Sequence, residues 1–277
     1  MAPRADFVSG YAPSGEAKIY FESTGAGPAL VFVHAGVSDS RMWDPQFEFF
    51  AARFRVVRYD HRGFGKSTLI DGPYTLRGDL LNVLAHLGIA TATIVGCSMG
   101  GAIAIDFTLE HPEVVAGLVL VGSGVSGLND PKELSEEALK HWAAYLSMVQ
   151  KGDVDGARAM DAKYWIDGPR RDAAQIDPVY RERALMLHRQ NFSLERDAHQ
   201  EQPLTPPAIG RLGEISARTI VVIGDNDSQD LIKLASKLAG EIPGARLITI
   251  AEAAHLPSLE RPELFNRILT EFLDSSG

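Results

Sequence analysis

The sequence predicts an α/β fold in which a mostly parallel, doubly wound sheet is covered by helices. Short β-branched runs recur along the chain, and the later ones are apolar throughout, as expected for strands buried on both faces of a parallel sheet. Helical patterns lie between these runs, and this alternation is typical of βαβ units. The alternation stops near residue 124 and resumes near residue 217, which predicts one insertion.

Each predicted element follows from its local pattern. Seven runs are predicted to be strands: 17–22, 29–34, 54–60, 91–96, 115–122, 218–224 and 245–250. Five segments are predicted to be helices: 42–51, 75–87, 99–110, 229–239 and 262–273. We expect the first two of these strands to form an antiparallel hairpin at one edge of the sheet.

The insertion reads as helices and returns through the proline-rich stretch 203–210. We therefore expect a core domain of residues 1–128 and 211–277, with residues 129–210 as a helical insertion over the sheet. Ligands bind at the carboxyl ends of parallel strands, so the insertion should lie over the binding site. The alternative is a helical decoration away from that site.

Composition excludes several classes of function. The 277 residues are 45% hydrophobic and 23% charged, which is typical of a globular protein. The formal charge of −9, with no cluster of Lys and Arg, argues against a nucleic-acid partner. One cysteine, Cys97, cannot form an internal disulfide, and no run is long enough for a membrane span or a signal peptide. A cytoplasmic location is the expectation.

The stretch Gly96-Cys97-Ser98-Met99-Gly100 matches G-x-S-x-G where a predicted strand meets a predicted helix. This turn is so sharp that side chains two positions before and after the serine would collide, which explains the two glycines. The pattern indicates that Ser98 is a nucleophile. The alternative is a glycine-rich turn in which Ser98 only caps the helix.

A serine nucleophile needs a base, and in this architecture the acid and the base follow the serine in that order. Among eight histidines, only His255 lies beyond the last plausible acid loop, and it follows the strand 245–250. The acid should follow the strand 218–224, where Asp225, Asp227 and Asp230 are the candidates. We favour Asp227, which lies beyond the turn, because a carboxylate there can orient the imidazole.

A developing oxyanion needs two backbone N–H donors. We expect one from Met99, which follows the nucleophile at a helix N-terminus, where the dipole also favours negative charge. The second should come from the loop after 29–34, from Gly36 or alternatively Val37. His34 is expected to brace this loop rather than to take part in the chemistry.

With these residues in view, the sequence resembles the α/β-hydrolase superfamily. The matching residues are His34-Ala35-Gly36, "YDHRGFGKS" (59–67), "GCSMGG" (96–101), "GDND" (224–227) and "AAHLPSLERPELF" (253–265). The resemblance extends from about residue 17 to 273, apart from the insertion. It implies an eight-stranded sheet, a helical cap and hydrolysis through an acyl-enzyme. It also implies roles for Ser98 as nucleophile, Asp227 as acid, His255 as base, and Gly36 and Met99 as oxyanion donors.

This resemblance leaves the reaction open. Ala35 replaces the usual glycine of the His-Gly loop, so either loop N–H could point inward. A small-molecule carboxylic ester or lactone is the expected substrate. The alternatives are carbon–carbon bond hydrolysis or cofactor-free peracid formation on the same three residues, or a ligand sensor with slow turnover. Ser98, in place of an aspartate, argues against dehalogenase or epoxide hydrolase chemistry.

Other motifs carry little weight. The stretch 63–68 lacks the first glycine of a phosphate loop. The stretch 122–127 matches G-x-G-x-x-G, but no helix follows it. We expect the small residues of 122–127 to leave room beside Ser98. No metal-binding motif is present, so neither metal nor cofactor is expected. In the insertion, His188 or Arg189 could meet a substrate carboxylate. Four aromatic residues could line an acyl pocket or pin the helices: Trp142, Tyr145, Tyr164 and Trp165.

Overall fold

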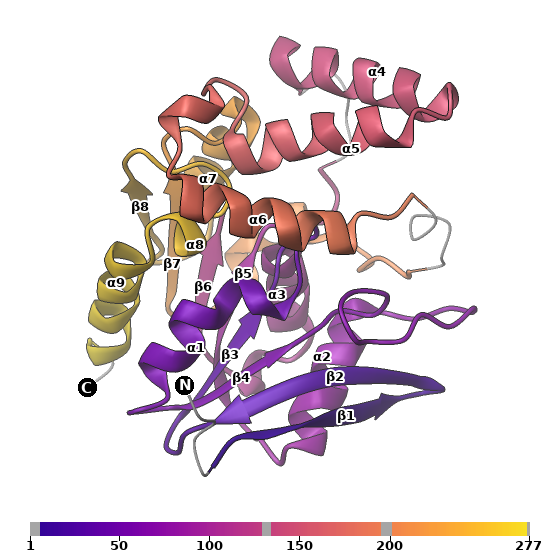
Figure 1. The fold of residues 1–277 in the computed structure, drawn as a ribbon. Helices are drawn as coiled ribbons and strands as arrows, with labels where there is room; N and C mark the ends of the chain where they lie inside the picture. The colour runs from indigo at the N-terminus through magenta and orange to yellow at the C-terminus, as the bar shows by residue number, and fades with distance from the viewer. Residues whose placement is uncertain (1–5, 129–133, 195–200, 276–277) are drawn as a thin grey trace.

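The computed structural model describes residues 6–128, 134–194 and 201–275. An eight-stranded sheet forms its centre, in the order β1-β2-β4-β3-β5-β6-β7-β8 (Figure 1). From β3 onward, neighbouring strands run parallel, which confirms the predicted α/β fold with a mostly parallel sheet. The strands are β1 (Val8–Ser14), β2 (Ala17–Thr24), β3 (Ala29–Val33), β4 (Arg55–Tyr59), β5 (Ala92–Cys97), β6 (Val115–Val121), β7 (Thr219–Gly224) and β8 (Arg246–Ile250).

The predicted hairpin between 17–22 and 29–34 is wrong. β2 pairs antiparallel with β1 on one side and with β4 on the other, while β3 lies between β4 and β5. The sequence prediction missed β1, because its sequence includes Gly10 and Pro13, which weaken a strand pattern. An edge strand tolerates both residues, since only one of its sides must pair.

Helices cover both faces of the sheet and create two hydrophobic cores. Along β3, Val31 and Val33 pack into one core, whereas Leu30 and Phe32 pack into the other. Helices α2 (Leu76–His86), α3 (Met99–Glu110) and α7 (Gln229–Glu241) bury side chains in the first core. Helices α1 (Asp44–Phe50), α8 (Pro257–Glu260) and α9 (Pro262–Asp274) do so in the second.

Four of the five predicted helices agree with the structure within two residues at each end. The fifth, 42–51, instead begins as a 3-10 turn, η1 (Ser40–Trp43), and continues as α1. Pro45 explains the break, because proline has no N–H and is tolerated in the first turn of a helix, where that N–H would have no helical partner. The α-helix therefore begins at Asp44, next to Pro45, and not at residue 42.

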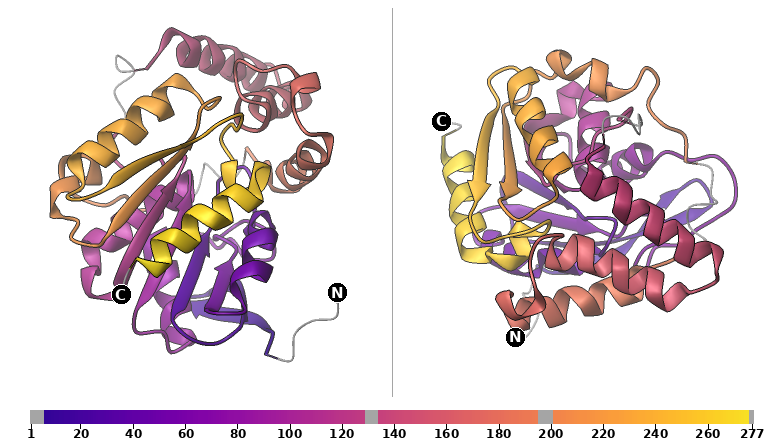
Figure 2. Two further views of the ribbon diagram at one scale, coloured as in Figure 1. Left: turned by 90° about the vertical axis from the view of Figure 1, so that its left-hand side faces the viewer. Right: turned by 90° about the horizontal axis from the view of Figure 1, so that it is seen from above.

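The described residues between β6 and β7 form mainly helices; we call residues 134–194 and 201–210 the insert. Figure 1 and the view from above in Figure 2 show its helices crossing over the end of the sheet where the parallel strands terminate. The predicted boundary at residue 129 lies outside the described residues. The elements are α4 (Glu136–Gln150), α5 (Val154–Ala162), η4 (Lys163–Asp167), η5 (Ala173–Gln175), α6 (Pro178–Asn191) and η7 (Ala208–Gly210), followed by η8 (Leu212–Glu214).

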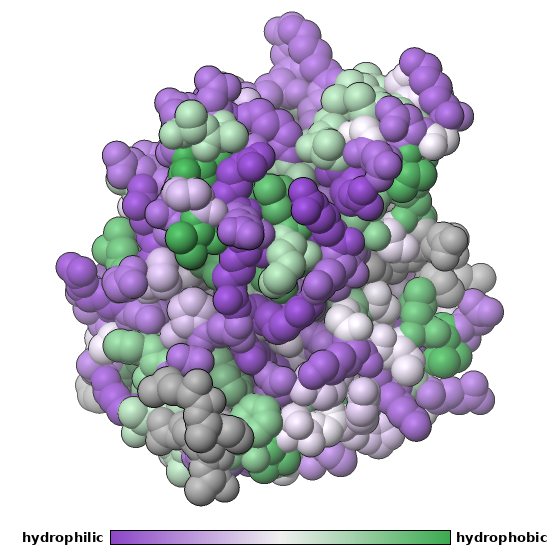
Figure 3. Space-filling model, in the orientation of Figure 1, coloured by the Kyte–Doolittle hydropathy of each residue, from purple (hydrophilic) through white to green (hydrophobic). Residues whose placement is uncertain are grey.

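The face of the molecule in Figure 3 is mostly hydrophilic, with hydrophobic residues scattered over it. Scattered apolar residues of this kind are normal on a globular surface. Within the described part of the chain, no helix is long and apolar enough to cross a membrane.

Candidate active site

Ser98 occupies a sharp turn between β5 and α3. Its φ of 54° is positive, a conformation that costs a non-glycine residue about 1–3 kcal/mol and must be held by its surroundings. A Cβ on Gly96 would lie 2.3 Å from the carbonyl oxygen of Gly100, and a Cβ on Gly100 would lie 2.3 Å from that of Val33. Only glycine fits at either position.

Hydrogen bonds hold this turn in place. The Ser98 N–H donates to the carbonyl of Val121 at 2.9 Å, and the Ser98 carbonyl accepts from the N–H groups of Gly101, Ala102 and Gly124. Ser98 therefore has a fixed backbone, while its side chain is half-buried at the edge of a cavity.

His255 and Asp227 form a buried pair. Nδ1 of His255 lies 3.0 Å from Oδ2 of Asp227, and each side chain is only 1% exposed. An ionised carboxylate can only accept, so the proton of the neutral ring lies on Nδ1 and leaves Nε2 as an acceptor. The other carboxylate oxygen accepts the N–H of Ser228 at 2.7 Å.

The other two acid candidates have different partners. Asp225 is exposed and accepts from the side chain of its neighbour Asn226, and Asp230 accepts from both the N–H and the hydroxyl of Ser135. Of the three aspartates, only Asp227 contacts the imidazole.

Ser98, Asp227 and His255 follow the carboxyl ends of β5, β7 and β8, and two contacts show that they lie near one another. Sγ of Cys97, the residue before Ser98, donates to the His255 carbonyl at 3.8 Å. A Cβ on Gly122 would lie 3.2 Å from Nδ1 of His255 and 3.3 Å from Oδ2 of Asp227. Gly122, one of the small residues in 122–127 that are expected to leave room beside Ser98, makes room for this pair. The Trp165 ring centroid also lies 4.5 Å from that of His255.

A cavity of about 520 Å³ opens beside Ser98, between the strand ends and the insert. This volume suits a small-molecule ligand. The oxyanion candidates Gly36, Val37 and Met99 line it together with Ser98. Within the described residues, none of these three N–H groups donates a hydrogen bond, so all are available. Which loop N–H is used stays open between Gly36 and Val37.

The rest of the cavity wall is largely aromatic. Trp142, Tyr145 and Trp165 contribute to it, whereas Tyr164 is buried behind them, in ring contact with Trp165. Phe64, Tyr74 and Phe192 add further rings. His188 also lines this cavity, while Arg189 faces a different one of about 380 Å³.

His34 has a bracing position, as expected. Its Nδ1 donates to the carbonyl of Ala35 at 2.8 Å, since its Nε2 accepts the N–H of His61 at 2.9 Å. The His61 ring returns a hydrogen bond to the His34 carbonyl at 2.8 Å. These bonds fix the loop that presents Gly36.

The insert is fastened to both loops that carry Asp227 and His255. Arg171 is buried and binds Glu260 through two hydrogen bonds of 2.7 and 3.2 Å. Glu260 also accepts the N–H of Ala254, the residue before His255, at 2.8 Å. Arg170 donates to the backbone carbonyl of Asp227 at 2.7 Å. Sequence patterns missed the contacts of Arg170 and Arg171, because no motif relates residues 57 or 89 positions apart.

Cys97, which is next to Ser98 in the sequence, and the potential metal ligands of the chain are further groups with a chemistry of their own. Burial raises the pKa of the Cys97 thiol well above its usual value, so this residue is a small packed side chain, as expected, and not a nucleophile. No group of three or more potential His, Cys, Asp or Glu metal ligands occurs in the described part of the chain.

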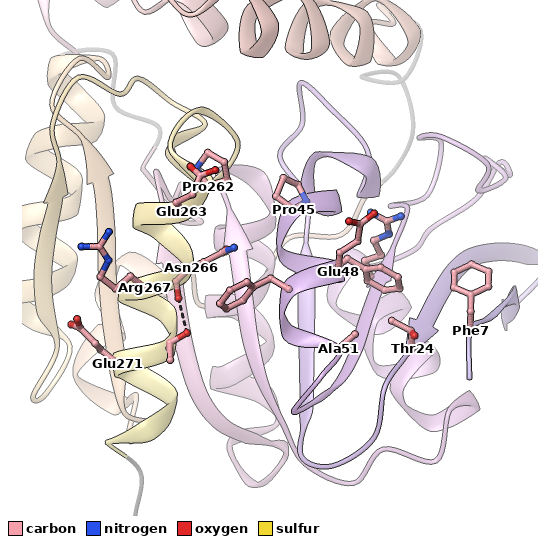
Figure 4. A pocket seen from close by; sticks show the side chains of 14 residues that line it. Phe7, Thr24, Pro45, Glu48, Ala51, Pro262, Glu263, Asn266, Arg267 and Glu271 are labelled. Carbon is pink, nitrogen blue, oxygen red and sulfur yellow. Dashed lines mark hydrogen bonds between the residues drawn. The ribbon is translucent and has the colours of Figure 1, made fainter. Parts of the chain in front are cut away.

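A larger cavity, about 1040 Å³, lies away from Ser98 between α1 and α9 (Figure 4). Phe7, Pro45, Glu48 and Pro262 are among its lining residues. None of the predicted site residues lines it, so its volume does not make it the catalytic site.

Comparisons with known proteins show the family of this chain. Residues 28–262 match the model of the alpha/beta hydrolase fold family. The chain is 28% identical to a 2-hydroxy-6-oxo-6-phenylhexa-2,4-dienoate hydrolase of Comamonas testosteroni, over 92% of this chain and 91% of the relative. It is 32% identical to a 2-hydroxy-6-oxononadienedioate/2-hydroxy-6-oxononatrienedioate hydrolase of Klebsiella pneumoniae, over 84% and 80%.

One solved structure is described as Est816, an N-acyl homoserine lactone degrading enzyme. It superposes with a TM-score of 0.76 at 27% identity, over 95% of this chain and 99% of that one. The match to the family model covers most of the sequence and includes the serine, acid and base positions. The chain belongs to the α/β-hydrolase family.

Proposed function

We propose that this hydrolase cleaves small carboxylic esters or lactones through an acyl-enzyme on Ser98. The observation that carries the proposal is the buried hydrogen bond between Asp227 and His255 beside the positive-φ turn of Ser98. A serine hydroxyl needs such a base, and a base needs such an orienting acid. The lactone-degrading structural relative supports this substrate class.

The proposed first half-reaction forms the acyl-enzyme. Nε2 of His255 takes the Ser98 proton as Oγ attacks the carbonyl carbon, because Nδ1 is committed to Asp227. The N–H of Met99, and that of Gly36 or Val37, stabilise the oxyanion. His255 then gives its proton to the leaving alkoxide, and the alcohol departs; in a lactone it stays attached to the acyl chain.

The second half-reaction reverses these roles. His255 takes a proton from water as the water oxygen attacks the acyl carbon, and the proton returns to Ser98 when the free acid leaves. We further propose that residues 129–210 act as a cap over a core of 1–128 and 211–277. The insert fits that role, since its aromatic residues line the cavity that contains Ser98.

A hydrolysis screen of short esters and lactones with purified protein tests the proposal. We expect multiple turnovers with at least one ester or lactone, and loss of that activity in Ser98→Ala. Rapid hydrolysis that persists in Ser98→Ala, or no turnover of any ester or lactone, would reject it.

Carbon–carbon bond hydrolysis is a second candidate, because the two relatives named above are hydrolases of 2-hydroxy-6-oxo compounds, a dienoate in one case and a dienedioate or trienedioate in the other. Comparing p-nitrophenyl acetate with a vinylogous diketone separates the two reactions. Preferential turnover of the diketone, lost in Ser98→Ala, would favour the second candidate.

A further inference from the structure

The cavity has a second carboxylate–imidazole pair, which belongs to the insert. Nε2 of His188, on α6, lies 2.7 Å from Oδ2 of Asp161, on α5. The His188 side chain is 1% exposed, whereas that of Asp161 is 14% exposed. Both residues line the same cavity as Ser98.

The two oxygens of Asp161 differ in their surroundings. Oδ2 is held by the His188 ring, while Oδ1 has no hydrogen-bond partner among the described residues. Nδ1 of His188 is fully buried and lacks a partner in the described part of the chain. Oδ1 of Asp161 is not fully buried, and it is therefore accessible. An acceptor with a fixed direction therefore opens into the cavity.

From this geometry we infer that Asp161, oriented by His188, is a substrate-binding residue that accepts a hydrogen bond from a donor group on the ester. The inference rests on the proposed ester or lactone hydrolysis and names its substrate class: small esters with a hydroxyl or ammonium group. A carboxylate can only accept, so a group without an N–H or O–H cannot satisfy it.

The remaining lining residues fit such a substrate. Aromatic side chains, Trp142 and Trp165 among them, supply apolar surface for the carbon skeleton, and indole rings are the aromatic groups that best attract a cation. The one Arg or Lys among the described lining residues, Arg62, already donates Nε and Nη2 to Asp79 at 3.0 and 2.6 Å. It does not neutralise Asp161.

Three ethyl esters of equal size test the inference on the acyl side: 3-methylbutanoate, 3-hydroxybutanoate and 3-aminobutanoate. Butyl acetate and 3-hydroxypropyl acetate form a matching pair on the alcohol side. In the wild-type protein, kcat/KM for a donor-bearing ester should exceed that of its methyl counterpart by about tenfold or more, as expected for a hydrogen bond to a charged group. The hydroxyl and ammonium arms show which donor is preferred.

Variants of Asp161 then locate the preference. Asp161→Ala should abolish it, so that kcat/KM for a donor-bearing ester falls to that of its methyl counterpart in the same variant. Asp161→Asn keeps an acceptor but no charge, so it should retain part of a hydroxyl preference and lose an ammonium preference. Asp155→Ala removes an exposed carboxylate from the same helix and should behave as the wild type.

The outcomes separate this inference from the proposed function. If esters are hydrolysed but donor groups bring no advantage, or the advantage survives in Asp161→Ala, the inference is wrong. A pair that only ties α5 to α6 would change turnover of all esters alike. If no ester is hydrolysed, the proposed function fails instead, and calorimetric binding of the esters to Ser98→Ala, with and without Asp161→Ala, still decides the inference.

Discussion

In the described part of the chain, two buried histidines each bind an aspartate, and they use opposite ring nitrogens. His255 bonds Asp227 through Nδ1, near its own backbone, whereas His188 bonds Asp161 through Nε2, at the tip of the ring. In the first pair the tip is not bound to the aspartate, and in the proposed mechanism it exchanges a proton with Ser98. In the second pair the tip is occupied, Nδ1 is buried without a partner, and the carboxylate is the more exposed member.

A histidine–aspartate pair can therefore be proposed for two uses. It suits a base where Nε2 of the histidine is left free, and it suits a fixed acceptor where an oxygen of the aspartate is left free. The pairs also differ in their support. The loops of Asp227 and His255 are tied to each other through the Asn226 N–H and the Ala253 carbonyl, at 2.9 Å. The pair of Asp161 and His188 joins α5 to α6, and no serine nucleophile is proposed beside it.

The largest expected effect is that of the nucleophile. Ser98→Ala should lower kcat for the best ester by about 10⁵–10⁶, because losing the nucleophile of such a triad leaves only binding and oxyanion stabilisation. Ser193→Ala, at another hydroxyl that lines the same cavity, is the matched control and should remain within a few-fold of wild type. Equal losses of kcat in Ser98→Ala and Ser193→Ala would contradict the assignment of Ser98 as the nucleophile.

The next effect compares the two aspartates directly. Asp227→Asn should lower kcat by about 10⁴, because an amide at this position favours the wrong imidazole tautomer. Asp161→Asn, measured on an ester without a donor group, should lose less than about tenfold. Steady-state kinetics on that one ester checks both values, and a reversed order would invert the assignment of the two pairs.

A third effect concerns the support of the first pair. Glu260→Gln leaves Arg171 as a buried, uncompensated charge and should reduce the free energy of unfolding by about 3–5 kcal/mol. Urea denaturation checks this value. Asp274→Asn breaks the exposed pair with Arg53 and should leave the unfolding midpoint unchanged. Similar midpoints for the two variants would show that the buried ion pair does not fasten the insert to the core.

The smallest effect is expected at Cys97, which contacts the first pair without joining its chemistry. Burial raises the pKa of this thiol, so little thiolate forms at neutral pH and alkylation of the folded protein should be slow. Cys97→Ala should keep activity within about threefold, as expected for a small packed side chain. Rapid alkylation with parallel loss of ester turnover would contradict this.

Sequence patterns predicted much of the fold because the strands and helices repeat strong local signals. Helix 99–110 has the predicted bounds, since the glycine-flanked serine marks its start. β1 escaped prediction because Gly10 and Pro13 obscure an exposed edge strand. The pairing of β2 with β4 could not be read either, because strand order depends on packing between distant segments.

The residues of the candidate site likewise include some that sequence patterns predicted and others that they did not. Ser98, Asp227 and His255 were predictable because each follows a recognisable strand, and the structure brings the carboxylate of Asp227 to His255 as expected. Contacts inside the insert were not predictable. Asp161 and His188 meet across two helices, and Arg171 meets Glu260 across the fold, with no local spacing to mark either pair.

The most direct test of the central claim is the rate at which a fluorophosphonate labels the protein, with the modified residue identified by mass spectrometry. The account predicts an adduct on Ser98, labelling slowed by at least about 10³ in His255→Ala, and labelling within a few-fold of wild type in His188→Ala. An adduct on another residue, or equal slowing in the two histidine variants, would contradict it.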